Sequence, residues 1–349
     1  MVAPLPAPPR PAALPLTMLA IRYADHGGPE VLQPTHLPVM PPGPNDVLVA
    51  LKAAGVSPLD CKLRAGLLAE HFTPELPKTP GRDGVGVVLA TGAHVLGFTP
   101  GDRVGVMAPA AAAAGTYAGA ILCSEGQLVA LPDGVGAVEA TTLINAGLSA
   151  WIAARTAGMR PGQRVLVHAG AGAVGSVLVQ LAKHLGARVT ATCRAANRDY
   201  VRGLGAERAI AYDAEDFTDL PPQDVVFDLV GGSVHERSYQ VLAPGGHLVW
   251  LTAAPIIDRS AQFGVRVSRA PISDDPDAVA EVMRLVSLGR IRPQVAGRLP
   301  LAQAAEAHRC LEAGEVTRGR LVLDIEGALD VPGGSLHSPL GWARNSSMT

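Results

Sequence analysis

A glycine-rich turn constrains the fold more than any other part of the chain: Val165-Leu-Val-His-Ala-Gly170-Ala-Gly172-Ala-Val-Gly175. A short apolar strand runs into Gly-x-Gly-x-x-Gly, and an apolar helical pattern follows it. Gly170 permits a tight turn, Gly172 lets the backbone approach a pyrophosphate, and Gly175 lets the helix lie close to the strand. This context predicts dinucleotide binding at a helix N-terminus. The alternative is a glycine-rich turn in another kind of α/β domain.

The composition indicates a globular protein large enough for two domains. The chain has 349 residues, of which 48% are hydrophobic and 17% charged, so it can bury sizeable cores. A formal net charge of −2 gives no electrostatic reason to expect nucleic acid or a membrane surface as a partner. No apolar run approaches the ~20 residues that a transmembrane helix needs. The scattered cysteines favour free thiols in a reducing cytoplasm: Cys61, Cys123, Cys193 and Cys310.

Two kinds of sequence pattern divide the chain into two parts. Closely spaced β-rich runs, punctuated by glycine and proline, cover 17–145 and predict a small β-barrel-like domain. Strand and helix patterns alternate over 146–292, which predicts a doubly wound parallel sheet. Its strands are expected at 164–168, 188–193, 209–212, 224–230, 246–252 and 264–268. Residues 293–326 are expected to rejoin the first domain, with a disordered tail at 1–16 and a mobile tail at 327–349.

Strand ends supply further candidates for the nucleotide site. Ligands of open α/β sheets bind at the carboxyl ends of the strands. We therefore expect the glycine turn to hold the pyrophosphate and two later strand ends to contact the rest of the dinucleotide. The residues concerned are Gly170, Ala171, Gly172, Ala173, Val174 and Gly175 in the turn, then Val230, Gly231, Leu251 and Thr252.

Several further motifs follow one another in a fixed order: Ser57-Pro-Leu-Asp60-Cys-Lys-Leu-Arg64-Ala-Gly66, Pro80-Gly-Arg-Asp83-Gly-Val-Gly-Val-Val88, Gly115-Thr-Tyr-Ala118, Asp228-Leu-Val-Gly-Gly232, Leu242-Ala-Pro-Gly-Gly246 and Gly319-Arg-Leu-Val-Leu323. In this order they resemble the medium-chain dehydrogenase/reductase superfamily, in its zinc-independent quinone oxidoreductase branch. The resemblance implies a GroES-like catalytic domain split into 17–145 and 293–326, with a Rossmann domain at 146–292 inserted. It also implies a homodimer joined through the Rossmann domains.

Zinc-dependent relatives in this superfamily hold a catalytic zinc with a cysteine, a histidine and a further cysteine. The matching positions here are Ser57, Arg82 and Asn145. None of these is a good zinc ligand, and an arginine would repel the ion. His168 adjoins the glycine turn, but a lone histidine beside a strand is usually packed or hydrogen-bonded. We predict neither a catalytic nor a structural zinc.

The residues after the second predicted strand favour NADPH over NADH. NAD sites place an acid about 20 residues beyond the glycine turn, whereas here Arg194-Ala-Ala-Asn197-Arg198 follows the strand. An arginine can donate two parallel hydrogen bonds to the oxygens of a 2′-phosphate. The family commonly uses a hydroxyl residue, a lysine and a tyrosine here. Arg194 falls at the hydroxyl position, Asn197 (or its neighbour Arg198) at the lysine, and Tyr212 at the tyrosine. A solvated arginine at a helix start is the alternative for Arg194.

Without a metal, hydrogen bonds alone must stabilise negative charge, which is easiest when a conjugated acceptor spreads that charge. Lys62, Tyr117 and Asn145 are the polar candidates for catalysis. Lys62 is equally compatible with a surface position or an ion pair, and Tyr117 with a packing role. By resemblance, Ser57 and Ser149 lie at the nicotinamide side.

The remaining residues of these motifs complete the expected cleft. Its charged residues are expected to form structural ion pairs beneath it: Asp60, Arg64, Arg82 and Asp83. Leu67, Leu68 and the Ala110–Ala114 loop are expected to form apolar walls. We predict an NADPH-dependent reductase of quinones or α,β-unsaturated carbonyls. The alternatives are an enoyl-thioester reductase or cyclisation-type enzyme, and a non-catalytic NADPH-binding protein.

Overall fold

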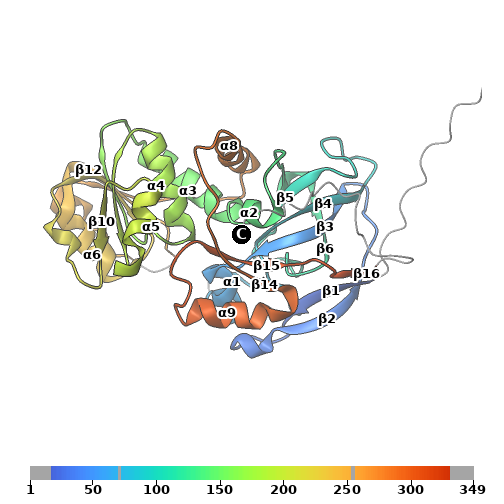
Figure 1. The fold of residues 1–349 in the computed structure, drawn as a ribbon. Helices are drawn as coiled ribbons and strands as arrows, with labels where there is room; N and C mark the ends of the chain where they lie inside the picture. Colours follow the sequence, from blue (N-terminus) through green and yellow to red (C-terminus); the bar gives the residue numbers. More distant parts are fainter. Residues whose placement is uncertain (1–16, 70–71, 253–255, 331–349) are drawn as a thin grey trace, which may run out of the picture.

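Two lobes lie side by side in the computed structural model, one built on a parallel sheet and the other on antiparallel strands (Figure 1). The structure describes residues 17–69, 72–252 and 256–330, so the tail expected at 1–16 lies outside it. Helix α3 (Ile144–Ala157) contacts strands of both lobes. Within the described ranges, no helix is both long and apolar enough to cross a membrane.

Six parallel strands form the sheet of the first lobe, in the order β10-β9-β8-β11-β12-β13. They are β8 (Arg164–Val167), β9 (Arg188–Cys193), β10 (Arg208–Ala211), β11 (Gln223–Asp228), β12 (Leu242–Trp250) and β13 (Arg266–Arg269). Its other helices are α4 (Ala173–His184), α5 (Arg198–Gly203), α6 (Ser233–Ser238), α7 (Ser260–Phe263) and α8 (Pro276–Ser287). The six strands expected from the sequence are confirmed, and the strand order reverses between β8 and β11, the kind of position at which open α/β sheets bind their ligands.

Alternation of side chains along the strands builds two cores in this lobe. Val165 and Val167 of β8 belong to the core that α3, α4 and α8 cover. Leu166, between them, belongs to a second core with Phe217 and Tyr239. Alternate residues of a strand point to opposite faces, so burial at every position indicates a sheet covered on both sides. The predicted doubly wound architecture is confirmed.

The second lobe is built on mainly antiparallel strands, with the sheet order β14-β15-β3-β4-β5-β7, β6 on β3, and a smaller sheet β16-β1-β2; only β14 and β15 pair in parallel among the described strands of this lobe. The strands are β1 (Thr17–Arg22), β2 (Gln33–Pro38), β3 (Asp46–Gly55), β4 (Asp83–Thr91), β5 (Arg103–Met107), β6 (Ala120–Ser124), β7 (Leu128–Ala130), β14 (Val295–Pro300), β15 (Arg320–Asp324) and β16 (Leu329–Asp330). The helices are α1 (Pro58–Arg64), α2 (Ala137–Thr141) and α9 (Ala304–Glu312). Because β15 pairs with β3, the C-terminal segment returns to this lobe. The domain boundaries stay predictions, and α3 runs across the one at 145/146.

The C-terminal segment corrects one expectation. Residues 327–330 were expected to belong to a mobile tail, but Leu329 pairs with Met18 of β1, and the carbonyl oxygen of Ala328 accepts a hydrogen bond from the Leu19 amide at 2.8 Å. Ala328 is buried in the core of this lobe. Two apolar residues thus extend the fold past the predicted end. The rest of the predicted tail lies outside the described residues.

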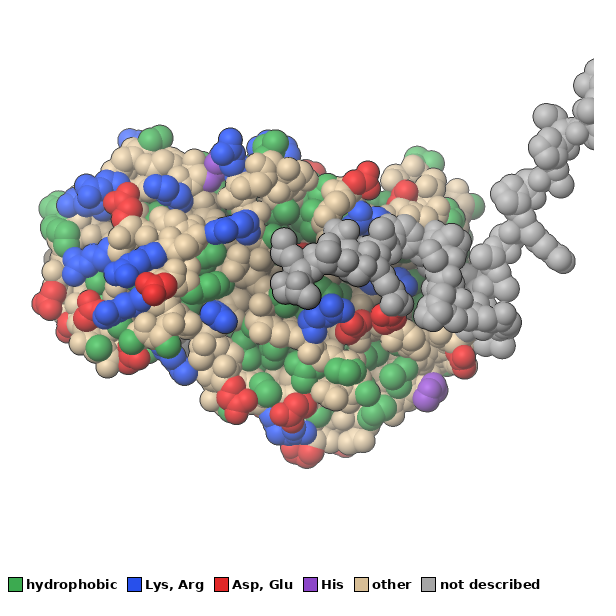
Figure 2. Space-filling view, in the orientation of Figure 1, with side chains coloured by type: hydrophobic (Ala, Val, Ile, Leu, Met, Phe, Trp, Pro, Cys, Tyr) green, Lys and Arg blue, Asp and Glu red, His purple; other side chains and the backbone are tan. Residues whose placement is uncertain are grey.

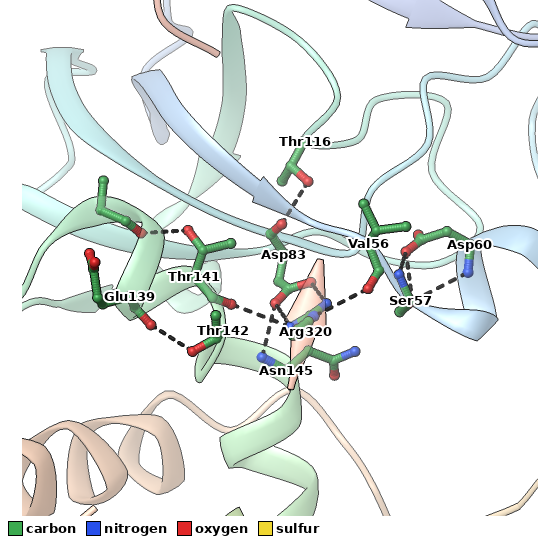
Figure 3. Close-up of polar contacts among 11 residues, drawn as sticks. Val56, Ser57, Asp60, Asp83, Thr116, Glu139, Thr141, Thr142, Asn145 and Arg320 are labelled. Atoms are coloured by element: carbon green, nitrogen blue, oxygen red, sulfur yellow. Dashed lines mark hydrogen bonds and ion pairs between the residues drawn. The ribbon is translucent and has the colours of Figure 1, made fainter. Parts of the chain in front are cut away.

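Arg320 joins several elements where the two lobes meet (Figure 3). The side chain is 3% exposed, and its two Nη atoms donate to both carboxylate oxygens of Asp83 at 2.6 Å. Its guanidinium also donates to the carbonyl oxygens of Val56 (3.3 Å) and Thr141 (3.4 Å). Asp83 Oδ2 accepts a further bond from the Asn145 amide at 3.1 Å. One buried ion pair therefore fixes β15, β4, the end of β3 and the start of α3 relative to one another.

The substitution Arg320→Met should lower the free energy of unfolding by about 3–5 kcal/mol, because it leaves the Asp83 charge buried and unpaired. Arg298→Met is the matched control, since Arg298 is an exposed arginine paired with Asp324 on the neighbouring strand. In Arg298→Met the free energy of unfolding should fall by less than about 1 kcal/mol. Urea unfolding at pH 7, followed by circular dichroism, measures both. Equal losses in the two variants would contradict this account of the ion pair.

Candidate functional site

The glycine turn joins β8 to α4 at the carboxyl edge of the parallel sheet. Ala169 has a φ of +51° and is the one non-glycine residue with a positive φ in the part of the chain that the structure describes. A Cβ on Gly170 would lie 2.6 Å from the Cβ of Ala191, and a Cβ on Gly175 would lie 2.2 Å from the carbonyl oxygen of Ala169. Neither position has room for a larger residue, so the turn has the close packing that the motif predicts.

Helix α4 begins at this turn without a side-chain cap. Gly172 is the N-cap residue, and no side chain bonds the amides of the first turn. A Cβ on Gly172 would meet the carbonyl oxygen of Ala169 at 3.4 Å, an ordinary contact distance, and Gly172 is partly exposed. The amides of Ala173, Val174 and Gly175 have no acceptor within the helix, and the helix dipole adds positive potential there. This arrangement suits an anion such as a pyrophosphate.

His168 is packed beneath the turn, as the sequence indicates. It is 1% exposed, with Nδ1 3.2 Å from Thr192 Oγ1 and Nε2 3.0 Å from Ser238 Oγ. Burial lowers the pKa of His168 to about 4. In the described ranges, no group of three His, Cys, Asp or Glu residues is placed to hold a metal ion.

The ends of β11 and β12 lie at the same edge of the sheet. Asp228 closes β11, and its Oδ1 accepts hydrogen bonds from the amides of Val230 (2.9 Å) and Gly231 (2.8 Å). Thr252, which follows Leu251 after β12, has a buried hydroxyl oxygen with no hydrogen-bond partner in the described part of the chain. A Cβ on Gly231 would lie 3.1 Å from that oxygen. The structure thus brings these predicted residues together around an unused polar atom.

Arg194 and Tyr212 meet where β9 and β10 end, as predicted for a 2′-phosphate site. Arg194 Nε lies 3.2 Å from the Tyr212 hydroxyl oxygen, and Nη2 donates to the carbonyl oxygen of Gly314 at 3.3 Å. A carboxylate also lies at this place, contrary to expectation. Asp213 accepts a hydrogen bond from the Ala195 amide at 3.0 Å. The sequence motif misses Asp213 because it follows the third strand and not the second.

Asn197 and Arg198 are committed to protein contacts. Asn197 is buried, and its Nδ2 donates to the carbonyl oxygen of Thr317 at 2.9 Å, so this side chain is already used in a contact within the protein; its cofactor role stays a prediction. Arg198 forms an ion pair with Glu215, and its cofactor role stays a prediction. Lys and Arg side chains gather with acidic neighbours over the face of this lobe seen in Figure 2.

Residues 314–319, which we call the strap, cross from α9 to β15 over the nucleotide turn. The Gly319 amide donates to the carbonyl oxygen of Ala171 at 2.8 Å, and the carbonyl oxygens of Thr317 and Gly314 accept the bonds described above. The Arg318 guanidinium carbon lies 5.7 Å from the centre of the Tyr200 ring. Sequence reasoning missed the strap, because its contacts join residues 118 or more positions apart. Its signal in the sequence is a glycine between two arginines just before a strand.

Ser57 and Asn145 flank the Arg320 ion pair on the barrel side (Figure 3). Ser57 caps α1, and its hydroxyl donates to Asp60 Oδ2 at 2.6 Å. Burial raises the pKa of Asp60. The Asn145 carboxamide lies beside Arg320 and has no hydrogen-bond partner among the described residues, and Ser149 follows one turn later on the same face of α3. The side-chain carboxamide of Asn145 is therefore available to a ligand, whereas the Ser57 hydroxyl is already bonded to Asp60.

Tyr117 lies inside the barrel lobe and not at its edge. It is 0% exposed, and its hydroxyl oxygen lies 3.2 Å from His308 Nε2, which accords with the packing alternative for Tyr117; its catalytic role stays a prediction. Lys62 is exposed on α1, and Asp60 contacts Ser57 in place of Lys62. A catalytic role for Lys62 stays a prediction.

The expected apolar wall exists in part. Leu68 and Ala110 are buried in one cluster with Leu63, whereas Leu67 is 73% exposed. A separate pocket of about 350 Å³ lies along α3 beside the segment that follows β13. It is lined by Ile152, Arg155, Thr156, Pro271, Ser273 and Asp275.

Comparisons with known proteins place the chain in a family. Residues 43–133 match the alcohol dehydrogenase GroES-like domain, and 204–323 match the model described as zinc-binding dehydrogenase. A quinone oxidoreductase of Pseudomonas aeruginosa is 32% identical over 326 residues, covering 87% of this chain and 98% of the relative. An NADPH-dependent alkenal/one oxidoreductase of Arabidopsis thaliana is 33% identical over 328 residues, covering 89% and 81%. The solved quinone oxidoreductase of Coxiella burnetii is 30% identical with a TM-score of 0.79, over 88% of this chain and 99% of that one.

The chain belongs to the zinc-independent quinone oxidoreductase branch of the medium-chain dehydrogenase/reductases. This is a family of pyridine-nucleotide-dependent oxidoreductases. The described residues fit such a nucleotide, because α4 begins uncapped, Gly172 at its start is partly exposed and the Thr252 hydroxyl is buried without a partner among them. They do not fit the zinc of the zinc-dependent relatives in this superfamily. At the three ligand positions lie a hydroxyl bound to Asp60, a guanidinium (Arg82) and the carboxamide of Asn145.

His168 should make the stability of this family member fall as the pH is lowered. The unfolded chain binds a proton below the ordinary pKa of 6.5, while the folded chain binds it only near pH 4. Acidification therefore favours unfolding, by about 2 kcal/mol at pH 5. Urea unfolding at pH 7 and pH 5 should show that His168→Gln loses about that much less than the parent on acidification. His94→Gln, which alters an exposed histidine, should change nothing. An unchanged pH dependence in His168→Gln would refute the assignment.

Proposed function

We propose that this chain transfers hydride from NADPH to a quinone or an α,β-unsaturated carbonyl compound. The observation that carries the proposal is the chemistry of the three positions that hold zinc in the zinc-dependent relatives. They carry a hydroxyl (Ser57), a guanidinium (Arg82) and a carboxamide (Asn145), which are hydrogen-bond donors and not good zinc ligands. Such groups stabilise charge best when the acceptor spreads it by conjugation. The names of the relatives in Pseudomonas and Arabidopsis, a quinone and an alkenal/one oxidoreductase, support the same acceptor class.

The chain positions the reactants and excludes water. NADPH, when bound, supplies the hydride. The amides of Ala173, Val174 and Gly175 hold its pyrophosphate at the start of α4, and the Thr252 hydroxyl gains a partner on the nicotinamide side. The Asn145 carboxamide, fixed through its backbone amide to Asp83, donates to an oxygen of the acceptor or the nicotinamide. The proton that completes the reduction comes from water.

The preference for NADPH rests on the end of the site where β9 and β10 finish. Arg194 and Tyr212 lie together there, and the strap adds Arg318. A guanidinium forks onto phosphate oxygens, so this group of donors favours a 2′-phosphate. Asp213 opposes that preference to some extent, since a carboxylate repels phosphate and accepts from ribose hydroxyls.

Two further parts of the proposal concern assembly and location. Strand β13 is the edge of the six-stranded sheet, and its outer side has no strand partner among the described residues. An unpaired edge can join the same edge of a second copy, so we propose a homodimer through this lobe. The four unpaired cysteines accord with a reducing cytoplasm.

The first experiment measures NADPH consumption by absorbance against quinones, enones and one enoyl thioester, with NADH in parallel. We expect turnover of a quinone or an enone, unchanged by a strong chelator. Turnover of the thioester alone would shift the assignment to a thioester reductase. If NADPH stabilises the protein against thermal unfolding but none of the acceptors leads to NADPH consumption, a non-catalytic binding role would be favoured.

The substitution Arg194→Ala should weaken NADPH binding roughly 10- to 100-fold and leave NADH binding unchanged, because it removes charge-assisted bonds to the 2′-phosphate. Arg188→Ala is the matched control: Arg188 lies at the opposite end of β9, exposed and paired with Glu207. Cofactor affinity is measured by quenching of protein fluorescence. Equal effects of Arg194→Ala on the two cofactors would overturn the assignment of Arg194.

A further inference from the structure

Arg82 bridges the two lobes at the carboxyl edge of the parallel sheet. Its Nη2 lies 2.8 Å from Asp274 Oδ1, on the segment that leaves β13, and its Nη1 donates to the carbonyl oxygen of Ala108 in the barrel lobe. Arg82 directly precedes Asp83, the partner of Arg320. The guanidinium therefore contacts the lobe that holds the nucleotide turn, from a residue that adjoins the buried ion pair in the sequence.

One donor of this guanidinium is unused. The Arg82 side chain is only 14% exposed, and its Nε is buried without a hydrogen-bond partner among the described residues. A buried N–H without an acceptor is unfavourable, and this one is closed to water in the structure, so it gains a partner only when an oxygen atom reaches it as the guanidinium or a neighbouring segment moves. The positive charge of Arg82 also acts on the carboxylate of Asp60, to which the Ser57 hydroxyl is bonded. Arg82 thus acts on the same edge that Ser57 and Asn145 flank.

We propose that Arg82 is a catalytic residue whose Nε–H donates to the carbonyl oxygen of the acceptor. This inference rests on the proposed function. Hydride carries two electrons and a proton to the β-carbon of an enone, and the π electrons shift to its carbonyl oxygen to give an enolate. On a quinone the added hydrogen ends on oxygen, directly or by a proton shift from carbon, to give the hydroquinone monoanion, a phenolate. The nicotinamide is left oxidised in both cases. Arg82 keeps its own proton and stabilises the resulting enolate or phenolate, because a guanidinium stays charged at neutral pH. Water then supplies the proton that completes the reduction.

The competing account is that Arg82 only braces the lobes through Asp274. The two accounts differ in what the removal of Asp274 does. Asp274→Asn removes the carboxylate but leaves the guanidinium and its Nε–H in place. If Arg82 only holds the lobes together, loss of either Arg82 or Asp274 should lower the activity equally. If Arg82 binds the acceptor oxygen, only the loss of Arg82 should lower it.

The kinetic test compares Arg82→Met, Arg82→Lys and Asp274→Asn, with an enone or quinone acceptor. We expect Arg82→Met to lower kcat about 100-fold or more, with the KM for NADPH unchanged, and Arg82→Lys to lie between it and the parent. Asp274→Asn should retain kcat within about threefold, and added guanidinium ion should restore part of the activity of Arg82→Met. Thermal unfolding checks that each variant is folded, and Arg82→Gln replaces Arg82→Met if the latter is not. Equal losses in Arg82→Met and Asp274→Asn, without rescue by guanidinium, would overturn the proposal.

A binding test needs no turnover. The probe is 4-nitrophenol with NADP⁺, because its ionised oxygen resembles the phenolate formed on a quinone and its absorbance reports ionisation. The parent and Asp274→Asn should bind the phenolate at least tenfold more tightly than Arg82→Met does. A parent that turns over no acceptor but binds phenolate through Arg82 would reject the proposed function and keep the Arg82 site. Phenolate affinity that is the same in all the variants would overturn the Arg82 site.

Discussion

The buried pair of Arg320 and Asp83 is the interaction on which the candidate site depends. A guanidinium and a carboxylate in a dry interior are stable together only when nearly every donor and acceptor is used, and here the remaining bonds go to the Val56 and Thr141 carbonyls and the Asn145 amide. Each of those groups ends or begins an element. The pair therefore sets where α3 starts, and with it where the Asn145 side chain lies.

The same strand couples this ion pair to the nucleotide turn. Arg320 follows Gly319 directly, and the Gly319 amide bonds the Ala171 carbonyl within the turn. Only one peptide bond thus separates the contact with the nucleotide lobe from the buried charge of the barrel lobe. Because β15 comes after the whole nucleotide lobe in the sequence, the barrel edge is complete only when the chain has returned from that lobe.

Local patterns in the sequence identified what local interactions decide. The strands of the parallel sheet, the glycine turn and the packed His168 depend on side-chain periodicity and backbone freedom, and all three are present. Tyr117 and Asn197 lie in the interior because of partners far along the chain, His308 and Thr317, and no local pattern in the sequence indicates those contacts. The strap and the short β16 strand were missed for the same reason, whereas Asp213 was missed because it follows the third strand of the sheet and not the second. A motif names a residue type, but the fold decides whether that side chain faces a ligand or the core.

The guanidinium of Arg82 explains why a site of this kind is matched to conjugated acceptors. A zinc ion concentrates two charges on one oxygen, whereas an arginine carries one delocalised charge, and here Asp274 offsets part of it. Such a site supplies oriented hydrogen-bond donors, the N–H of Arg82 and the carboxamide of Asn145, but a weaker positive potential than a zinc ion. An isolated ketone would leave a full charge on its oxygen after hydride addition, more than these donors stabilise. A quinone or enone spreads that charge through its π system, so the chemistry of the acceptor supplies what the metal-free edge lacks.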